Sequence, residues 1–172
     1  MKAVLLPIWP QYCELITNGK KTVEVRKSFP NIPTPFRCYI YETKGKTDIP
    51  TFVDEDGHYI YEGRGQVIGE FEVKDYTCFI PVTSAKSGCL DYLFASEEIL
   101  RECCLTKDEL LKYGKGKQLY GWHISDLVIY DKPKELADFK GRKLVWRGNN
   151  HVHAYEQIKR PPQSWCYVEV VA

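Results

Sequence analysis

The sequence predicts an α+β domain in which a small mixed sheet closes towards a β-barrel, with short helices at its periphery. A strand and a short helix open the chain, and most later segments have strand periodicity, with helices inserted between some of them. A doubly wound fold would instead need regular alternation of strands and helices. The 172 residues are enough for one domain with a buried core, so we expect a single domain over 1–172.

Composition and charge exclude several classes of protein. Hydrophobic residues make up 44% of the chain and aromatic residues 13%, which excludes a disordered polypeptide. The chain has 24 basic and 23 acidic residues, so it lacks the basic surplus of a protein that coats nucleic acid nonspecifically. A local basic patch is nevertheless present between residues 20 and 46. A near-zero net charge with one basic patch favours a ligand that binds at a single local site.

The sequence also bears on compartment and cofactors. No apolar run approaches the roughly 20 residues of a membrane span, and residues 1–8 are too short for a signal peptide. We therefore expect a cytoplasmic protein without a membrane partner. The seven cysteines form no C-x-x-C pair, which in a reducing compartment favours buried thiols. His151 and His153 lack the ligand spacing of a zinc site, and we expect no metal and no cofactor.

Glycine, proline and alternation predict the elements of the first half of the chain. Residues 1–8 form a strand, and Pro10 opens a short helix because proline is tolerated at the first helical position. Gly19 ends this helix by adopting a left-handed conformation. Further strands are predicted at 22–26, 36–41 and 66–75, and the polar segment 44–65 is predicted to hold a hairpin around Asp56-Gly57.

Caps and alternation predict the second half. Ser96 caps a helix that runs to Cys103, and Thr106 with Glu109 forms the capping box of a second short helix. The remaining predictions are a strand at 119–130, a helical turn at 131–136, a polar insertion at 144–158 and a closing strand at 165–170.

The stretch 18–27, which follows the first helix, carries the main candidate site. Alternation places Val23 and Val25 on one face of a strand, and Thr22, Glu24 and Arg26 on the other. Glu24 and Arg26 are two residues apart on that face, close enough for a charge-assisted hydrogen bond. An ordinary surface strand has the same pattern, so the alternation alone does not distinguish a site from a structural ion pair.

Residues outside this stretch complete the candidate site. Lys21 leaves the turn where it can reach a phosphate or a reacting carbonyl. Glu70 or Glu72, on another predicted strand, supplies a second carboxylate, and the sequence leaves open which of them faces the cleft. Aromatic rings can stack on a base, an interaction worth about 1–3 kcal/mol per base; the candidates are Tyr41, Trp122 and Trp165. Burial of the tryptophans in the core is the alternative.

The pattern G-x-K-x-x-E-x-R, formed here by Gly19, Lys21, Glu24 and Arg26, resembles that of ASCH domains in the PUA-like superfamily. The segments 120–124 and 161–168 resemble the tails of small ASCH proteins often found in prophages. The likeness covers 1–45, 66–76 and 119–139, with insertions at about 44–65 and 77–118. It implies a PUA-like β-barrel with a cleft that family members are thought to use for RNA or modified nucleosides.

We expect from this resemblance that the chain binds RNA or a nucleotide-like ligand, including a modified nucleoside, without turnover. A near-neutral net charge suits recognition of one nucleotide or a short single-stranded segment. The predicted ligand-binding residues line the cleft next to the motif: Lys21, Thr22, Glu24, Arg26, Tyr41, Trp122, His123, Gln163, Ser164 and Trp165. A protein-partner domain is the alternative outside nucleic-acid biology.

Two enzymatic alternatives follow from the same resemblance, with Lys21, Glu24 and Glu70 as the catalytic residues. Some small ASCH proteins resemble amidohydrolases that act on N-acylated cytidine with a lysine, a threonine nucleophile and a glutamate. Here Glu24 occupies the nucleophile position, and Thr22 serves only if the site shifts by two residues. The other alternative is a ribonuclease for single-stranded RNA, in which His123, Lys21 and Glu24 supply the acid and base.

Overall fold

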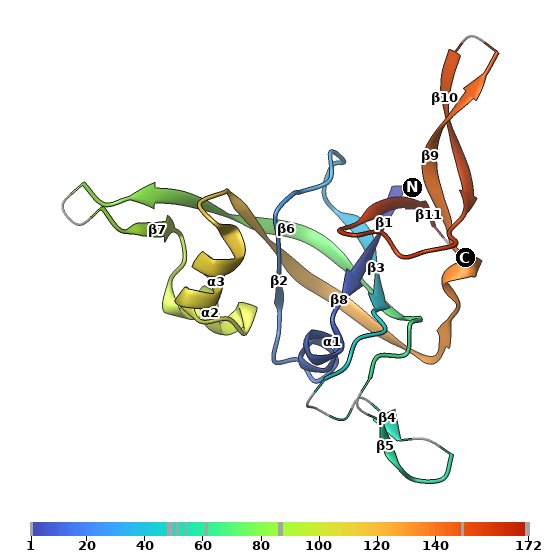
Figure 1. The fold of residues 1–172 in the computed structure, drawn as a ribbon, viewed down its shortest axis with the longest axis horizontal. Helices are drawn as coiled ribbons and strands as arrows, with labels where there is room; N and C mark the ends of the chain where they lie inside the picture. The colour runs from blue at the N-terminus through green and yellow to red at the C-terminus, as the bar shows by residue number, and fades with distance from the viewer. Residues whose placement is uncertain are drawn as a thin grey trace. The chain divides into compact units, whose positions relative to one another are not determined.

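A computed structural model of the chain describes residues 2–47, 50, 52–53, 55–60, 62–85, 88–148 and 150–170. The chain divides into two compact units (Figure 1). The first unit comprises Met1–Glu14, Phe36–Glu72 and Asp126–Ala172, and the second comprises Leu15–Pro35 and Val73–Ser125. Two long strands, β6 (Val67–Thr83) and β8 (Leu119–Lys134), contribute to both units, and helix α1 (Pro10–Thr17) begins in the first and ends in the second.

The first unit is a mixed sheet with the strand order β10-β9-β11-β1-β3-β6-β8. Strand β1 pairs in parallel with β3 and antiparallel with β11, while β9 and β10 form an antiparallel hairpin. The bounds of its further elements are β1 Lys2–Ile8, β3 Phe36–Glu42, β4 Phe52–Val53, β5 Tyr59–Ile60, the 3₁₀ turn η1 Leu136–Asp138, β9 Lys140–Arg147, β10 Asn150–Gln157 and β11 Cys166–Glu169.

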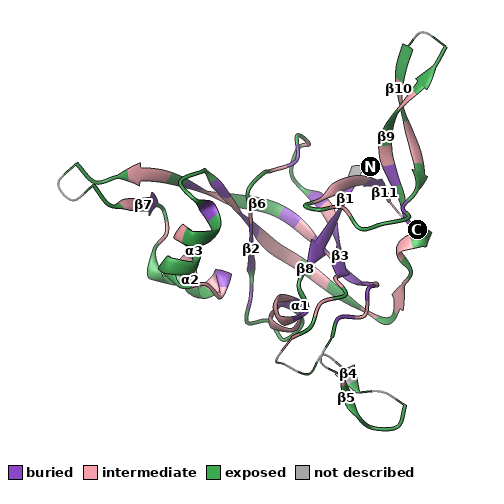
Figure 2. Ribbon diagram, in the orientation of Figure 1, coloured by how far each residue is buried: buried purple, intermediate pink, exposed green. Residues whose placement is uncertain are grey.

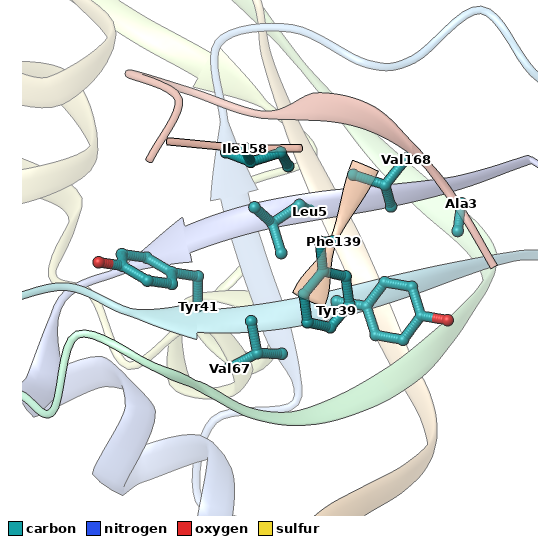
Figure 3. Packing of buried hydrophobic residues seen from close by; sticks show 8 residues of the cluster. All are labelled: Ala3, Leu5, Tyr39, Tyr41, Val67, Phe139, Ile158 and Val168. Carbon is teal, nitrogen blue, oxygen red and sulfur yellow. The ribbon is translucent and has the colours of Figure 1, made fainter. Parts of the chain in front are cut away.

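The core of the first unit gathers side chains from distant parts of the sequence, shown in Figure 3. Tyr39 on β3 packs edge-on against Phe139, with ring centroids 4.9 Å apart. The cluster consists of Ala3, Leu5, Tyr39, Tyr41, Val67, Phe139, Ile158 and Val168. Large aromatic side chains bury much apolar area each, so this cluster fixes β1, β3 and the start of β6 against β11 and the two ends of the β9–β10 hairpin.

The second unit joins antiparallel strands to two capped helices. Strand β2 (Val23–Arg26) pairs with β8, and β7 (Leu90–Leu93) pairs with β6. Helices α2 (Glu97–Cys103) and α3 (Lys107–Gly114) have the predicted Ser96 cap and the predicted Thr106–Glu109 capping box. The core residues of this unit are Val23, Val25, Phe79, Tyr92, Cys103, Leu110 and Leu119.

The predicted α+β class with a mixed sheet is confirmed, but the predicted closure towards a barrel is wrong. Closure requires the two edge strands of a sheet to pair with each other. In the described part of the first unit, the strand order ends at β10 on one side and at β8 on the other, with no pairing between them. The reason is the β9–β10 hairpin, which occupies the edge beyond β11 and leaves the sheet open (Figure 1).

Most predicted elements are found, and two differ. The first strand, the first helix, the hairpin around Asp56-Gly57 and the closing strand are all present. The helical turn predicted at 131–136 is strand β8 as far as Lys134, followed by η1. The segment 144–158, predicted as a polar insertion, forms most of the β9–β10 hairpin. No helix within the described ranges is long and apolar enough to cross a membrane.

Gly121→Ala should lower the free energy of unfolding by about 1–3 kcal/mol, the usual cost of overpacking. Gly121 lies on β8 opposite Val25, and an added Cβ would be 2.8 Å from Val23 Cγ1 and 3.0 Å from Phe79 Cε2. Urea unfolding followed by circular dichroism measures the change. Gly45→Ala is the control, because its added Cβ meets no atom closer than 3.7 Å. Equal effects of the two changes would contradict tight packing of β2 on β8.

Candidate functional site

The turn between α1 and β2 sets the direction in which Lys21 leaves the helix. Gly19 has a φ of 73°, a left-handed conformation that glycine adopts without strain. Its N–H donates to the Ile16 carbonyl at 3.0 Å, and the Lys21 N–H donates to the Leu15 carbonyl at 2.8 Å. The helix end is thereby closed by backbone hydrogen bonds, as the sequence predicted.

Lys21, Glu24 and Arg26 form one charge network. The Lys21 Nζ donates to the Cys103 carbonyl at 2.6 Å and lies 3.4 Å from the Glu24 Oε2. The Arg26 Nη2 lies 3.0 Å from the Glu24 Oε1. The side chains are 2%, 7% and 13% exposed in sequence order. The structure thus brings together the three charged residues of the predicted motif, with Arg26 the most accessible of them.

Burial makes the network a constraint on the fold as well as a candidate site. A buried charge is costly unless it is paired and hydrogen-bonded. Here one carboxylate serves two cations, so the network carries a net positive charge. Lys21 is almost fully enclosed and also bound to the Cys103 carbonyl, so Arg26 is the most accessible cation of this network.

The β2–β8 register places aromatic residues on the face that carries Glu24 and Arg26. Glu24 is opposite Trp122, and Arg26 is opposite Tyr120. Directly opposite residues in an antiparallel pair point to the same side of a sheet. Arg26 therefore lies beside an aromatic ring, an arrangement that suits a planar ligand with a negative charge.

Four rings of the second unit form an aromatic cluster, defined as Phe29, Tyr76, Tyr120 and Trp122. Phe29 lies at its centre, with centroid distances of 4.2 Å to Tyr76, 5.5 Å to Trp122 and 5.9 Å to Tyr120. Trp122 is fully buried, whereas Tyr76 is 41% exposed and the other two rings are half-buried. The cluster is therefore buried at Trp122 and partly exposed at Tyr76.

Sequence reasoning missed Phe29, Tyr76 and Tyr120 as candidate ligand-binding residues. Trp122 was predicted as a stacking residue or a core residue, and the structure places it in the core. Tyr120 could have been found from its position two residues before Trp122, which puts both on one face of a strand. Tyr76 gives no such local signal, because its approach to Phe29 depends on long-range strand pairing.

The other predicted residues of the second unit lie apart from this face. His123 is opposite Val23, so it lies on the other side of the β2–β8 pair, and its Nε2 is 2.9 Å from the Thr77 Oγ1. Thr22 is exposed, and its backbone N–H donates to the Glu102 carbonyl at 3.0 Å. The structure therefore brings Lys21 and Glu24 together but separates His123 from them by the sheet.

Glu70 lies in the first unit, where it belongs to a different polar group. Its Oε1 is 3.3 Å from the Arg37 Nη1, and its Oε2 accepts a hydrogen bond from the Tyr130 hydroxyl. Burial and the Glu70 carboxylate raise the pKa of Tyr130, which keeps that hydroxyl protonated and able to donate. Glu72 is half-buried in the same strand.

The last three predicted ligand-binding residues precede β11. Gln163 and Ser164 are exposed, and Trp165 is half-buried. Trp165 packs edge-on against Tyr167, with ring centroids 5.2 Å apart. Within the first unit, this segment thus holds one ring against another and leaves two polar side chains accessible.

Tyr41, also predicted to bind the ligand, lines a cavity of about 560 Å³ in the first unit. The cavity also has two lysines, a glutamate and a glutamine on its walls; the lining is Tyr41, Thr43, Lys44, Gly65, Glu135, Leu136, Ala137, Gln157, Ile158, Lys159 and Pro161. Its volume is within the range of small-molecule sites. Burial and the charge of Glu135 raise the pKa of Tyr41, so its hydroxyl remains protonated at neutral pH.

Known proteins resemble this chain in sequence over part of its length. An ASCH domain-containing ribonuclease from Zymomonas mobilis is 29% identical over 83 residues, which cover 44% of this chain and 56% of that protein. The match thus spans little more than half the length of the curated relative. No family model matches the sequence.

The structural likeness extends over nearly the whole chain. The crystal structure of ASCH from Zymomonas mobilis matches with a TM-score of 0.54 and 19% identity, covering 95% of this chain and 85% of that one. A mutant of that protein with tyrosine replaced by phenylalanine also gives 0.54, over 96% and 88% of the two chains. The chain has the ASCH fold. The resemblance that the sequence motif indicated is therefore confirmed at the level of the fold.

Glu24→Gln should lower the free energy of unfolding of this ASCH fold by about 3 kcal/mol or more, because it removes the charged partner of Lys21 and Arg26 in a nearly buried network. Lys21→Met should cost less, since Glu24 keeps Arg26 as its partner. Urea unfolding measures both changes. Lys107→Met is the control, because it removes a 2.7 Å contact between Lys107 and Asp91, two side chains that are each about half exposed. It should lower the free energy of unfolding by less than about 1 kcal/mol. Equal effects of the three changes would contradict a buried network that depends on Glu24.

Proposed function

We propose that the chain binds single-stranded RNA, or a nucleotide-like ligand, at the face of β2 and β8 that carries Arg26 and the aromatic cluster. The observation that carries this proposal is the combination of an arginine with partly exposed rings on one face. Single-stranded nucleic acids are bound by aromatic rings that stack on bases and by cations that contact phosphates. The relative's name, a ribonuclease, adds support for an RNA partner.

The roles of the residues follow from their accessibility. Tyr76, the most exposed ring of the cluster, stacks on a base, and Phe29 holds it from behind at 4.2 Å. Arg26 contacts the adjacent phosphate, while Glu24 orients the guanidinium through the 3.0 Å contact. Lys21 acts through Glu24 and does not itself touch the ligand. The motif thus positions Arg26, and the rings supply most of the contact area.

Lys27 adds a second cation to this part of the second unit. Its Nζ lies 4.7 Å from the centroid of the Tyr113 ring, a distance typical of a cation–π contact. Burial raises the pKa of Tyr113, an effect that the nearby positive charge of Arg26 opposes. Two cations and several rings in one small region suit a short stretch of RNA, in agreement with the nearly neutral net charge of the chain.

Tyr76→Ala should weaken binding of a short fluorescein-labelled oligouridine about tenfold, from loss of one base–ring stack. Fluorescence anisotropy at low salt measures the dissociation constant. Tyr76→Phe keeps the ring and should bind nearly as well as the wild type. Phe94→Ala is the matched control, since Phe94 is a 65% exposed ring of the same unit outside the aromatic cluster. If Tyr76→Ala and Phe94→Ala bind alike, or the wild type does not bind, the proposal fails.

A second candidate function, RNA cleavage, is favoured by the cavity that Tyr41 lines. The cleavage of RNA by its own 2′-hydroxyl needs a base that removes the proton from this hydroxyl and an acid that protonates the departing 5′-oxygen. It yields a 2′,3′-cyclic phosphate and a 5′-hydroxyl. The Tyr41 hydroxyl, protonated at neutral pH, would donate the proton in the acid role, and the Glu135 carboxylate on the same cavity wall would accept one in the base role. Lys44 and Lys159 would offset the charge of the phosphate.

Tyr41→Phe should reduce any cleavage of a fluorescence-quenched RNA by about 100-fold or more, the usual contribution of a general acid. The ring is retained, so the core cluster is expected to keep its packing. Tyr39→Phe is the matched control, because Tyr39 is on the same strand and in the same core cluster but is not among the residues that line the cavity. Absence of cleavage by the wild type, with RNA binding intact, would rule out this candidate and leave the binding proposal unaffected.

The amidohydrolase alternative has less support from the geometry. The position of the nucleophile is held by Glu24, whose two carboxylate oxygens are engaged with Lys21 and Arg26. Thr22, the substitute that the sequence offered, is exposed directly before the strand that carries this network. Incubation with N-acylated cytidine remains the direct test, and turnover that Lys21→Ala abolishes would favour this alternative over RNA binding.

A further inference from the structure

The β9–β10 hairpin has two faces of different chemistry. Trp146 is opposite His151 near the turn, and Lys140 is opposite Gln157 at the base of the hairpin. One face, named here the basic–aromatic face, carries Lys140, Arg142, Leu144 and Trp146 on β9 and His151, His153, Tyr155 and Gln157 on β10. The opposite face carries Gly141, Lys143, Val145 and Arg147 on β9 and Asn150, Val152, Ala154 and Glu156 on β10.

The basic–aromatic face is rich in cations and rings. Among the described hairpin residues, the acidic side chain, Glu156, lies on the opposite face, where it contacts Lys143 at 3.1 Å. On the basic–aromatic face, Trp146 is 68% exposed and Leu144 is 58% exposed. The Trp146 ring lies 3.7 Å from that of His151, so the indole is held in place although it is exposed.

The base of the hairpin is anchored to β11, while its distal part is largely exposed. The Arg142 guanidinium lies over the Tyr167 ring at 4.6 Å, and Lys140 is 3.9 Å from the Glu169 carboxylate. Figure 2 colours most of the distal part of both strands as exposed. The hairpin is thus held at its base by contacts with β11, and its exposed part presents the Trp146 ring to solvent.

We propose that the basic–aromatic face of the β9–β10 hairpin is a second RNA-contacting surface, which takes a single-stranded segment. This inference rests on the proposed RNA-binding function but concerns residues outside the β2–β8 face. Trp146 stacks on an unpaired base, and Lys140 and Arg142, which precede it on the same face of β9, contact phosphates of the same RNA strand. Charge complementarity selects this occupant, since the hairpin residues of the face combine cations with rings. The neighbouring carboxylate, Glu169 of β11, is the partner of Lys140 at 3.9 Å.

A single strand fits this face better than a duplex. The deep, narrow major groove of A-form RNA does not admit a two-stranded ribbon, and bases in a duplex are already stacked on each other. An exposed indole gains a stacking partner only where a base is unpaired. The 61% exposed side chain of Lys140 remains accessible to a phosphate, because its 3.9 Å contact with Glu169 is a weak surface ion pair.

The charge test compares two double variants that remove the same charge from opposite faces of the hairpin. Lys140→Ala with Arg142→Ala should weaken binding of oligouridine and lower the slope of log K against log salt by about 1.4, or about 0.7 for each phosphate contact. Lys143→Ala with Arg147→Ala is the matched control and should leave the slope near that of the wild type. Thermal unfolding of both variants checks that the hairpin is retained.

The stacking test uses Trp146→Ala, which changes an exposed side chain and is expected to preserve the fold. It should weaken RNA binding about 5- to 100-fold, the range expected from loss of one base–ring stack. The anisotropy probe must be long enough to reach beyond one binding surface, so oligouridines of increasing length are compared. Val145→Ala, on the opposite face, is the control and should bind like the wild type.

Four outcomes are distinguishable. Loss of affinity in Trp146→Ala and in the Lys140–Arg142 variant, but not in their controls, supports the inference. If the wild type binds RNA, Tyr76→Ala weakens binding and the hairpin variants do not, the inference is overturned and the proposed function stands. If the wild type binds no RNA, both are overturned. Binding to vesicles of anionic phospholipid is measured for the same variants. If they lose binding to the vesicles but bind oligouridine like the wild type, the surface is a membrane contact and the inference is overturned.

Discussion

The pairing of one carboxylate with two cations is the interaction on which the second unit depends. Glu24 contacts both Lys21 and Arg26, and Lys21 also donates to the carbonyl of Cys103, 82 residues away in the sequence. The neighbouring backbone repeats this link, since the Thr22 N–H donates to the Glu102 carbonyl. These contacts fasten the start of β2 to the end of α2. Removal of this carboxylate would take away a charged partner of two nearly buried cations, and breaking a buried ion pair on one side is costly.

This arrangement changes what the motif can do. A lysine enclosed to 3% exposure and bound to a carbonyl is not available to a phosphate in the same way as a surface lysine. In the proposed function, the ligand therefore contacts Arg26 rather than Lys21. Arg26 is paired with Tyr120 across the two strands, and the Tyr120 ring packs near Phe29, which in turn packs against Tyr76. A conformationally fixed guanidinium beside rings loses little freedom on binding a planar ligand, and such preorganisation favours affinity. In the proposed function, the motif therefore supports a binding face.

Local patterns predicted most elements, and long-range pairing explains what they missed. Caps at Ser96 and Thr106 and the alternation around Glu24 are signals within a few residues, and the structure contains all of them. The β9–β10 hairpin was not predicted because cations and rings occupy the positions that usually form an apolar stripe, so binary alternation gives no clear period there. The closed barrel was predicted from the order of the elements and from the PUA-like resemblance, and neither contains the β9–β10 hairpin at the edge of the sheet. The aromatic cluster depends on the β2–β8 register and on the approach of Tyr76, neither of which a local pattern contains.

The near-neutral charge of the chain fits a protein that contacts RNA on small faces. Other acidic residues lie in the first turns of α2 and α3 and contribute to the net charge of +1. On the β2–β8 face, the one carboxylate of Glu24 is shared by Lys21 and Arg26, so this network keeps a positive charge. Each face offers few phosphate contacts, which limits affinity at physiological salt. Two modest contacts on one chain can still hold a strand firmly, because once one is made the second becomes intramolecular, provided that the strand spans both. Stacking on fixed rings then contributes binding energy that salt screens weakly, whereas the arginine and lysine contacts set the dependence on ionic strength.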